Sequence, residues 1–310
     1  MMDSVSIELT RYAPLELIIP WGALGVAYLA RTAAGSWLSE KTRRELSARI
    51  NTWLKILFFF TIPAFLGNVA IVVAMAVVSY LALREFISIT QLGARSRTQC
   101  FAAYALIPIT YAIVHFHPKY PGLFSLPMLA AIVISCVSAL RGETGNYISK
   151  ISTLLWGYTF LVFNLSLSVI FISPDATIAR GGFYTLLLLT VTNDVMQYVW
   201  GKTFGRRKLF PHVSPGKTVG GAVGGVLSTM LTSIALAPYL IGLSGRLAAG
   251  LGLTISLAGI LGDLCFSAIK RNLGIKDSST ALPGHGGYLD RVDSLTLSAP
   301  AFFSFCMLML

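Results

Sequence analysis

Residues 267–293 read S-A-I-K-R-N-L-G-I-K-D-S-S-T-A-L-P-G-H-G-G-Y-L-D-R-V-D and interrupt an otherwise strongly apolar chain. This polar segment concentrates four basic side chains, three acids, a histidine and a Gly-Gly pair. Lys and Arg neutralise phosphate oxygens, Asp binds Mg²⁺, and glycine lets backbone N–H groups approach an anion. The polar segment, which lies between two hydrophobic stretches, therefore predicts a phosphate-rich ligand.

The composition places those hydrophobic stretches in a membrane. Hydrophobic residues make up 55% of the 310 positions, charged residues only 12%, and the mean hydropathy is +0.72. A soluble domain carries about twice that fraction of charge. In lipid, a helix satisfies all of its own backbone hydrogen bonds. We therefore predict an all-α fold, a polytopic integral membrane helix bundle.

Ten apolar runs approach the length of a transmembrane helix, which needs roughly 20 residues. They cover residues 15–33, 52–66, 69–89, 100–116, 123–140, 151–172, 182–200, 219–240, 248–268 and 295–310. Residues 52–89 are too many for one helix, and Pro63 with Gly67-Asn68 offers a tight hairpin between two. The prediction is about ten transmembrane helices, with nine as the alternative.

The positions of the basic residues support this division. All but four of the 24 Lys and Arg lie in loops that follow odd-numbered spans, or at the adjoining helix ends. By the positive-inside rule, these loops and the polar segment are cytoplasmic, with both termini outside. The net charge of +11 suits this topology, anionic lipid head groups and a polyphosphate ligand. We see no nucleic-acid-binding motif and expect no nucleic-acid partner.

The ninth predicted span leads directly into the polar segment. Asp263, Ser267, Lys270 and Arg271 share one helical face by their spacing. A carboxylate inside the membrane is costly and needs a cation or a basic partner. A local pair of Asp263 with Lys270 or Arg271 that only pins the helix is the simpler interpretation. The density of charge in the polar segment exceeds what pinning needs, and it favours a ligand site.

A second polar stretch, residues 193–225, lies between spans seven and eight. Asp194 is again a carboxylate at membrane depth. Ser214-Pro215 predicts a helix N-cap followed by Pro at the first helical position, with Lys217 and Thr218 in the first turn. Free N–H groups beside a lysine form an anion site. An ordinary capped helix explains this stretch equally well on its own, and the polar segment shifts the balance to phosphate binding.

Glycines recur in both stretches. The pairs Gly220/Gly224 and Gly221/Gly225 have the spacing of close helix packing, which we prefer for the second pair. His285 differs from the other histidines because glycines flank it and free the backbone for close approach of a ligand.

Together, these residues resemble the signature of the phosphatidate cytidylyltransferases, also called CDP-diacylglycerol synthases. The pattern S-x-x-K-R-x(4)-K-D … P-x-H-G-G-x-x-D-R-x-D is matched at Ser267, Lys270, Arg271, Lys276, Asp277, Pro283, His285, Gly286, Gly287, Asp290, Arg291 and Asp293. The upstream pattern, D-x-x-x-Y-x-x-G-x-x-x-G and then S-P-x-K-T, is matched at Asp194, Tyr198, Gly201, Gly205, Ser214, Pro215, Lys217 and Thr218. The resemblance covers roughly the C-terminal third of the chain.

The resemblance implies that CTP and phosphatidate react to give CDP-diacylglycerol and pyrophosphate. Asp263 and Asp290 are then expected to bind Mg²⁺, with a second cation left open. Catalytic roles fall to Asp263, Asp290, Lys270 and Arg271, and substrate binding to Ser214, Pro215, Lys217, Thr218, Ser267, Lys276, His285, Gly286, Gly287 and Arg291. Supporting roles fall to Asp194, Tyr198, Asp277 and Asp293.

Two regions of the chain follow from this assignment. Residues 1–180 are expected to be scaffold helices that give access to lipid, and residues 181–310 the catalytic helices with their cytoplasmic loops. The expected partners are CTP, phosphatidate or a related lipid phosphate, and membrane lipids. A homodimer is left open. The expected location is the inner membrane of a bacterium, crossed several times, with the active site on the cytoplasmic side.

One departure from the family pattern keeps other functions open. The family usually continues S-P-x-K-T with Trp-Glu-Gly, whereas this chain has Val219-Gly220-Gly221. A CTP-dependent transferase or kinase acting on a polyprenol or isoprenoid lipid is therefore an alternative. A non-catalytic lipid-binding or transport protein is a further alternative, and retention of every fixed signature position argues against it.

Overall fold

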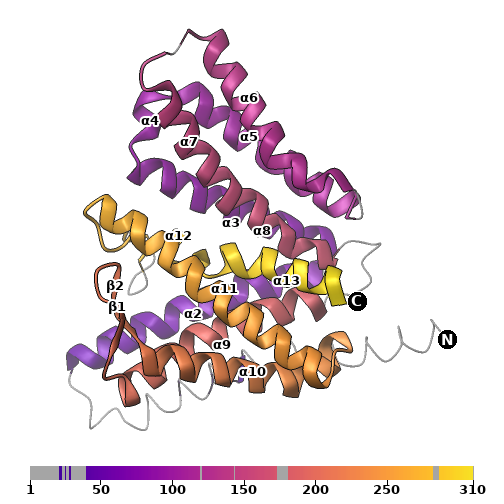
Figure 1. Ribbon diagram of the computed structural model, residues 1–310, viewed down its shortest axis with the longest axis vertical. Helices are drawn as coiled ribbons and strands as arrows, with labels where there is room; N and C mark the ends of the chain where they lie inside the picture. Colours follow the sequence, from indigo (N-terminus) through magenta and orange to yellow (C-terminus); the bar gives the residue numbers. More distant parts are fainter. Residues whose placement is uncertain are drawn as a thin grey trace, which may run out of the picture.

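The computed structural model describes residues 21, 22, 25, 28, 40–118, 121–142, 144–172, 181–281 and 286–309. The described chain is a bundle of packed helices with one small hairpin at its end (Figure 1). The N-terminal elements are α2 (Glu40–Leu66), α3 (Asn68–Ile89), α4 (Leu92–Arg95), α5 (Arg97–Phe116), η1 (Pro121–Ser125), α6 (Leu126–Leu140), α7 (Tyr147–Tyr158), η2 (Thr159–Phe163), α8 (Asn164–Ser166) and η3 (Leu167–Ile172). The C-terminal elements are α9 (Gly181–Phe204), β1 (Lys208–Phe210), β2 (Ser214–Thr218), α10 (Val219–Ile241), α11 (Gly245–Asn272), α12 (Leu289–Val292) and α13 (Leu295–Met309).

Seven helices in the described part of the chain are long and apolar enough to cross a membrane. They are Asn68–Ile89, Arg97–Phe116, Gly122–Leu140, Tyr147–Ile172, Val219–Ile241, Gly245–Asn272 and Leu289–Met309. The polytopic helical membrane fold predicted from the sequence is thus confirmed, and seven of the ten predicted spans correspond to these helices. The predicted spans 52–66 and 182–200 are helical, as parts of α2 and α9, but these two helices are not among those long and apolar enough to cross a membrane. Most of the predicted span 15–33 lies outside the described residues.

The division of residues 52–89 into two helices is confirmed. The helix α2 ends at Leu66, and α3 begins at Asn68 after a single linking residue, Gly67. Gly67 has a φ of 114°, which L residues with a side chain rarely adopt, and its N–H donates to the Pro63 carbonyl at 3.0 Å. Pro63 itself lies inside α2, so the turn depends on the glycine and not on the proline.

The predicted helix start at Ser214-Pro215 is wrong. Ser214–Thr218 forms the strand β2, which pairs antiparallel with β1 (Figure 1). The helix α10 begins four residues later, and Thr218 is its N-cap, with Oγ1 accepting a hydrogen bond from Gly221 N at 3.1 Å. Pairing with β1 gives the backbone of Ser214 and its neighbours hydrogen bonds that a helix start would leave unmade. Lys217 therefore extends from a strand instead of a first helical turn.

Glycines bring α9 and α10 into close contact. A Cβ on Gly221 would meet the Gln197 carbonyl oxygen at 2.6 Å, and a Cβ on Gly224 would collide with the Trp200 side chain. Gly225 lies equally close to Gln197. The predicted packing role of Gly221 and Gly225 is confirmed, and it extends to the first glycine pair. Without side chains between the two backbones, short polar residues at the ends of these helices can reach one another.

The N-terminal helices are packed differently, through rings and buried hydroxyls. Trp156 of α7 stacks on Phe160 with ring centroids 4.1 Å apart and touches Phe266 of α11 edge-on. The Tyr111 hydroxyl lies 2.7 Å from Ser79 Oγ, which satisfies both groups in the membrane interior. This part of the bundle supplies a rigid apolar wall behind the C-terminal helices.

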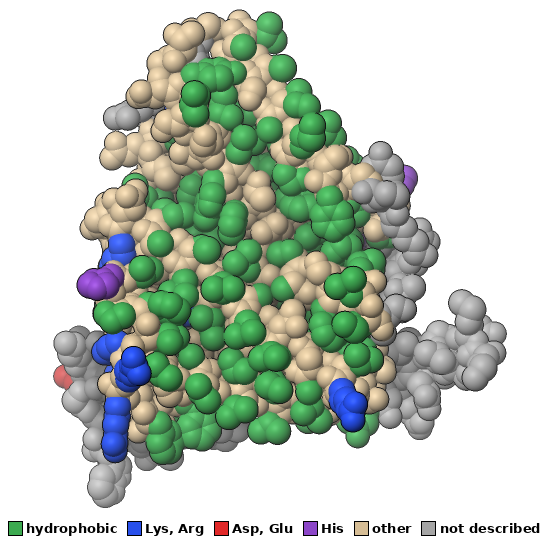
Figure 2. All heavy atoms as spheres, viewed as in Figure 1, with side chains coloured by type: hydrophobic (Ala, Val, Ile, Leu, Met, Phe, Trp, Pro, Cys, Tyr) green, Lys and Arg blue, Asp and Glu red, His purple; other side chains and the backbone are tan. Residues whose placement is uncertain are grey.

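The surface has the character of a membrane protein. Figure 2 shows hydrophobic side chains spread over the flank of the bundle, with Lys and Arg gathered mainly at the end that carries β1 and β2. Large apolar side chains such as Leu227, Leu231 and Phe101 are more than half exposed. An apolar band with a charged end is the arrangement expected of a bundle whose sides contact lipid.

Candidate active site

Asp263, Lys270 and Arg271 lie in the C-terminal half of α11. Ser267 Oγ donates a hydrogen bond to Asp263 Oδ1 at 3.2 Å, which confirms that these residues share a face. Lys270, one turn further on, is 8% exposed. Arg271 faces the hairpin, as Asp263 does, and its Nε donates to the Val213 carbonyl at 3.3 Å. Arg271 thereby fixes the hairpin against the end of α11.

The cation beside Asp263 comes from the hairpin. Lys217 Nζ lies 2.8 Å from Asp263 Oδ2, and the side chains are 14% and 27% exposed. The ion pairs that we considered within α11, with Lys270 or Arg271, are not formed among the described residues. The strand β2 and the helix α11 are thus joined by a partly buried ion pair.

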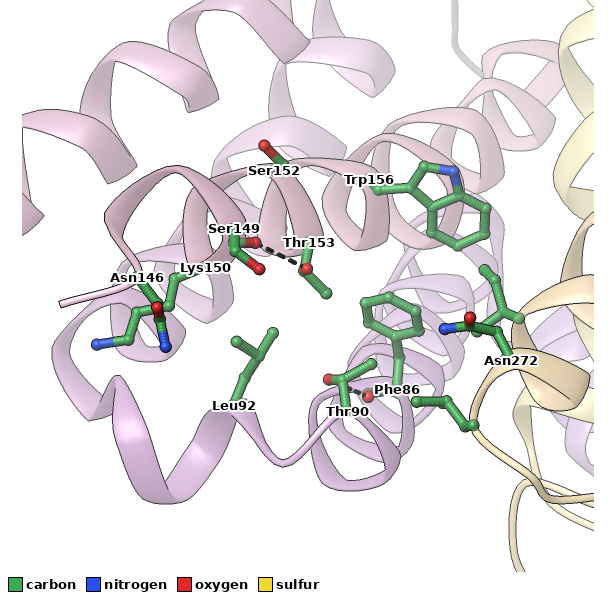
Figure 3. A pocket seen from close by; sticks show the side chains of 12 residues that line it. Phe86, Thr90, Leu92, Asn146, Ser149, Lys150, Ser152, Thr153, Trp156 and Asn272 are labelled. Carbon is green, nitrogen blue, oxygen red and sulfur yellow. Dashed lines mark hydrogen bonds between the residues drawn. The ribbon is translucent and has the colours of Figure 1, made fainter.

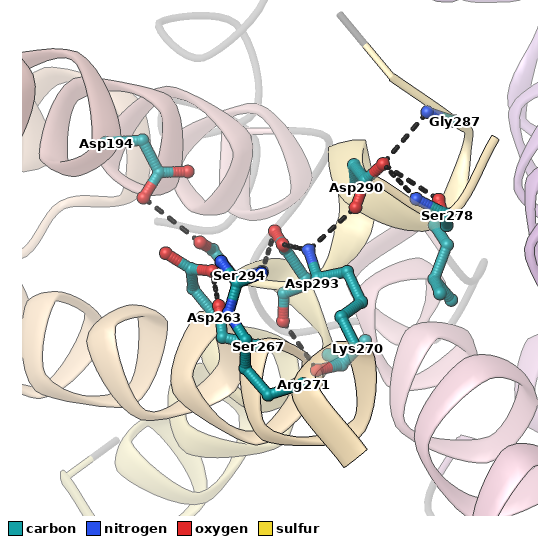
Figure 4. Close-up of polar contacts among 12 residues, drawn as sticks. Asp194, Asp263, Ser267, Lys270, Arg271, Ser278, Gly287, Asp290, Asp293 and Ser294 are labelled. Carbon is teal, nitrogen blue, oxygen red and sulfur yellow. Dashed lines mark hydrogen bonds and ion pairs between the residues drawn. The ribbon is translucent and has the colours of Figure 1, made fainter. Parts of the chain in front are cut away.

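Lys270 pairs with the acids of the following segment. Its Nζ lies 2.7 Å from Asp290 Oδ1 and 3.8 Å from Asp293 Oδ2. The second oxygen of Asp290 accepts hydrogen bonds from Ser278 N at 3.0 Å, Ser278 Oγ at 2.8 Å and Gly287 N at 2.9 Å (Figure 4). Asp290 therefore organises the loop before α12 and neutralises a buried lysine.

Three further carboxylates converge near this pair. Ser294 joins two of them, because its Oγ donates to Asp194 Oδ1 at 3.0 Å and its N–H donates to Asp293 Oδ1 at 2.8 Å. Asp194, Asp263 and Asp293 are close enough to repel one another electrostatically. Figure 4 shows these acids facing a common region between α9, α11 and the start of α13. We call Asp194, Asp263, Asp290, Asp293, Lys217 and Lys270 the acid–base cluster.

Two glycines permit the close contacts of Asp290 and Asp293. A Cβ on Gly262 of α11 would lie 2.5 Å from the Asp293 carbonyl oxygen. Gly286 has a φ of 77°, and a Cβ there would lie 2.5 Å from Asp290 Oδ2. Because glycine has no side chain at these positions, the turn can close on Asp290, and the backbone at Asp293 can approach α11.

Several other predicted residues lie at the margin of the cluster. Arg291 is close enough to Asp194 to interact with it electrostatically, although its side chain is exposed. Lys276, Asp277 and Pro215 are exposed, and Tyr198 is 59% exposed with Lys202 Nζ 5.8 Å from its ring centre. Their substrate-binding and supporting roles stay predictions. His285 lies outside the described residues.

The sequence analysis missed Glu85 of α3, which is 8% exposed. Its Oε2 accepts a hydrogen bond from Leu289 N at 3.1 Å, and its Oε1 is buried without a hydrogen-bond partner among the described residues. A Cβ on Gly287 would collide with this Oε1 and lie 2.4 Å from Ser278 Oγ. Glu85 therefore supports the Gly286-Gly287 turn from behind. The sequence does contain a signal for Glu85, because a carboxylate inside the apolar run 69–89 is as costly in the membrane as Asp263.

The acid–base cluster has the donor chemistry for a hard cation, since carboxylate oxygens suit Mg²⁺. Asp263 fits this role best, because each of its oxygens has one partner and the side chain is partly exposed. Both oxygens of Asp290 are already engaged. Among the described residues, no three or more His, Cys, Asp or Glu side chains are arranged as a metal cage. The Mg²⁺ roles of Asp263 and Asp290 stay predictions.

The fold and the cluster define the class: a polytopic helical membrane protein with charged groups for a phosphate-bearing substrate at one end. Residues 47–309 match the family described as the cytidylyltransferase family. The chain belongs to this family, which supports a CTP-using transferase.

Individual relatives refine this picture. An uncharacterized protein of Escherichia coli K12, YnbB, is 36% identical over 271 residues, which cover 86% of this chain and 89% of that protein. The phosphatidate cytidylyltransferase of Aquifex aeolicus is 41% identical over 147 residues, 47% of this chain and 54% of that protein. That of Mycobacterium bovis is 33% identical over 157 residues, 51% of each protein. The chain thus matches only about half the length of these phosphatidate cytidylyltransferases.

Proposed function

We propose that the protein transfers the cytidylyl group of CTP to phosphatidate, giving CDP-diacylglycerol and pyrophosphate. The observation that carries this proposal is the pairing of two partly buried lysines with carboxylates of the cluster, Lys217 with Asp263 and Lys270 with Asp290. Phosphate oxygens can replace carboxylates as partners of these lysines. The similarity of half the chain to phosphatidate cytidylyltransferases supports phosphatidate as the acceptor.

The reaction requires the protein to position the two substrates and to neutralise the charge of their phosphates. A phosphate oxygen of the lipid attacks the α-phosphorus of CTP, the bond to the β-phosphate breaks, and pyrophosphate leaves. No covalent protein nucleophile is required. Lys217, Lys270 and Arg291 would neutralise the phosphates. Mg²⁺, when bound, would supply further positive charge for the triphosphate, and Asp263 is the most available ligand with Asp290 as the second.

The hairpin, which carries Lys217 of the cluster, lies on the side of the bundle where basic side chains gather (Figures 1 and 2). By the positive-inside rule we propose that this side faces the cytoplasm, where CTP is present. The inner membrane of a bacterium is the proposed location, in keeping with the bacterial relatives. Lipid would enter sideways, between helices whose outer faces are apolar.

A second candidate, transfer to another lipid phosphate, is favoured by Gly220. A Cβ at this position would lie 3.0 Å from the Phe204 carbonyl oxygen and 3.2 Å from its carbon. The end of α9 therefore occupies the space that a larger residue would need. The relative matched along most of its length, YnbB, is also uncharacterized, so it does not indicate an acceptor.

The experiment uses purified protein with labelled CTP, Mg²⁺ and one lipid at a time: phosphatidate, a polyprenyl phosphate or a polyprenol. Labelled CDP-diacylglycerol that needs phosphatidate, and that disappears when EDTA removes the metal, is the expected result. Turnover with a polyprenyl lipid but not with phosphatidate would overturn the acceptor. Absence of turnover with every lipid, from protein that still binds CTP, would favour a non-catalytic lipid-binding protein.

Gly220→Glu tests the position at which this chain departs from the Trp-Glu-Gly of the family pattern. Gly220→Ala is the control for packing alone. Both variants crowd Phe204, and overpacking costs about 1–3 kcal/mol. If position 220 sets the acceptor, only the Glu variant changes the ratio of kcat/KM between phosphatidate and the polyprenyl lipid. An unchanged ratio of kcat/KM would show that position 220 does not select the acceptor.

A further inference from the structure

A cavity of about 450 Å³ opens between the end of α3, α4, the start of α7 and the end of α11 (Figure 3). Its volume falls within the range of small-molecule sites, about 300–1,000 Å³. It is distinct from the acid–base cluster. Ile269, Asn272 and Leu273 at the end of α11 line it, and no residue of the acid–base cluster does.

The rim of the cavity is polar and carries one cation, Lys150. Near it, Asn146 and Ser149 come from the start of α7, whereas Asn272 comes from the end of α11 and lies on the far side of the cavity, beside Phe86 (Figure 3). The side chains of these four residues form no hydrogen bond or ion pair with any described residue. No acidic side chain is among the described residues that line the cavity. Four side chains with free donors thus surround one space, and the charge there is positive.

Other hydroxyls around the cavity are already engaged. Ser152 Oγ donates to the Ile148 carbonyl at 2.7 Å, and Thr153 Oγ1 donates to the Ser149 carbonyl at 2.8 Å. These bonds lie within α7 and leave their protons unavailable. The donors left for a ligand are therefore Lys150 and the three neutral side chains on the rim.

The floor of the cavity is apolar and includes Phe86, Trp156 and Leu92. Trp156 is already stacked, with ring centroids 4.1 Å from Phe160 and 5.5 Å from Phe86. A nucleobase would find little free ring face here, whereas a hydrocarbon chain needs only apolar surface. An apolar floor below a cationic rim matches a phospholipid with its phosphate at the rim and part of one acyl chain inside.

We propose that this cavity binds one anionic phospholipid, with Lys150 contacting the phosphate and with Phe86, Leu92 and Trp156 contacting one acyl chain. Lys150 lies near the start of α7, and the cavity is at the same end of α11 as the basic residues of the cluster. The head group therefore lies at the membrane surface where anionic lipids would meet it. Binding here involves none of the residues of the acid–base cluster.

The test uses full-length protein in nanodiscs without CTP, so its outcome does not depend on nucleotidyl transfer. Photoactivatable phosphatidylglycerol and photoactivatable phosphatidylcholine are compared, and the labelled peptides are mapped by mass spectrometry. We expect phosphatidylglycerol to label peptides that contain Phe86–Leu92 or Ser149–Trp156, and phosphatidylcholine to label them weakly. Lys150→Gln should lower the labelling by about fivefold, the effect of one lysine at an anionic surface.

Two matched variants complete the experiment. Lys208→Gln removes an exposed lysine of the hairpin and should leave the labelling of these peptides within about twofold of wild type. Ser149→Phe fills the cavity without changing charge and should abolish the labelling. Equal labelling by the two lipids, or a Lys150→Gln variant that labels like wild type, would overturn the proposal. Competition by millimolar inorganic phosphate as strong as that by unlabelled phosphatidylglycerol would assign the cavity to free phosphate and overturn the lipid.

Discussion

Residues 181–309 and residues 40–172 are both helical and apolar, but they are held together in different ways. The C-terminal helices meet through glycines such as Gly224 and Gly262, whereas the N-terminal helices α3 and α7 meet through rings such as Phe86 and Trp156. Glycine contacts bring backbones together, so that short Asp and Ser side chains at helix ends converge. The cavity beside α7 lies in the region that is joined by ring contacts. The type of packing thus decides where charged groups can meet.

Glu85 is the contact that links the two regions at the cluster. It comes from α3 and accepts from Leu289 N, beside the turn that holds Asp290. We call residues 181–309 the glycine-packed region and residues 40–172 the ring-packed region. We expect the chemistry to reside in the glycine-packed region, Glu85 to couple the two regions, and the ring-packed region to contribute only stability.

The largest effect is expected from Asp290→Asn. The variant weakens the pair with the buried Lys270 and should lower kcat by at least about 10²-fold, in the range seen when one charge-stabilising group is removed. Turnover of labelled CTP is the measurement. Lys208→Gln, an exposed change in the hairpin, should retain near wild-type turnover.

Because Lys270 is buried, Asp290→Asn could also reduce folding. A melting temperature and a gel-filtration profile separate the two effects. The double variant Lys270→Gln with Asp290→Asn removes both charges and should be better folded but still inactive. Wild-type turnover in a folded Asp290→Asn protein would contradict the role of this pair.

Gly287→Ala should have the next largest effect, because its methyl group would collide with Glu85 Oε1. We expect kcat/KM to fall by about tenfold, as the turn that holds Asp290 shifts. Glu85→Ala removes the nearer of two obstacles and leaves Ser278 Oγ, so the double variant should be less impaired than the two single effects predict but not fully restored. A coupling of about 0.5–3 kcal/mol is typical of residues in contact. Strictly additive effects would show that Glu85 does not support the turn.

Gly224→Ala should lower stability more than activity per folded molecule. Its methyl group would overlap the Trp200 side chain and push α10 from α9, at about 1–3 kcal/mol. Gly250→Ala in α11 is the matched control, because a Cβ there would lie 3.4 Å from Phe305, an ordinary contact. Thermal unfolding in detergent compares them, and equal melting temperatures would mean that glycine packing is not what joins α9 to α10.

Tyr158→Phe should have the smallest effect. It removes the hydroxyl that lies 2.6 Å from Thr110 Oγ1 in the N-terminal helices. A loss of about 1 kcal/mol in unfolding free energy is expected, since Thr110 Oγ1 keeps its bond to the Leu106 carbonyl. The kcat for CTP should stay within twofold of wild type. A large loss of kcat without a loss of stability would assign chemistry to the ring-packed region.

The amino-acid sequence by itself determined the membrane class, most helix positions and the residues of the cluster. Hydrophobic run length and the spacing of Asp263, Ser267 and Lys270 are local properties, and they can be read without knowing what packs against what. The error at Ser214-Pro215 has a physical reason. A Ser-Pro pair is compatible with either a helix start or an extended strand, and only the presence of β1 selects the strand.

The tertiary structure alone decided which charges are partners. Helical spacing suggested a pair within α11, but Lys217 reaches Asp263 from a strand 46 positions away, and Lys270 turns to Asp290. Glu85 approaches Leu289 across 204 positions of sequence. Contacts between distant segments depend on how closely two backbones approach, and here glycines on facing helices set that approach. The residue types were therefore legible in the sequence, whereas their pairing arose from the packing.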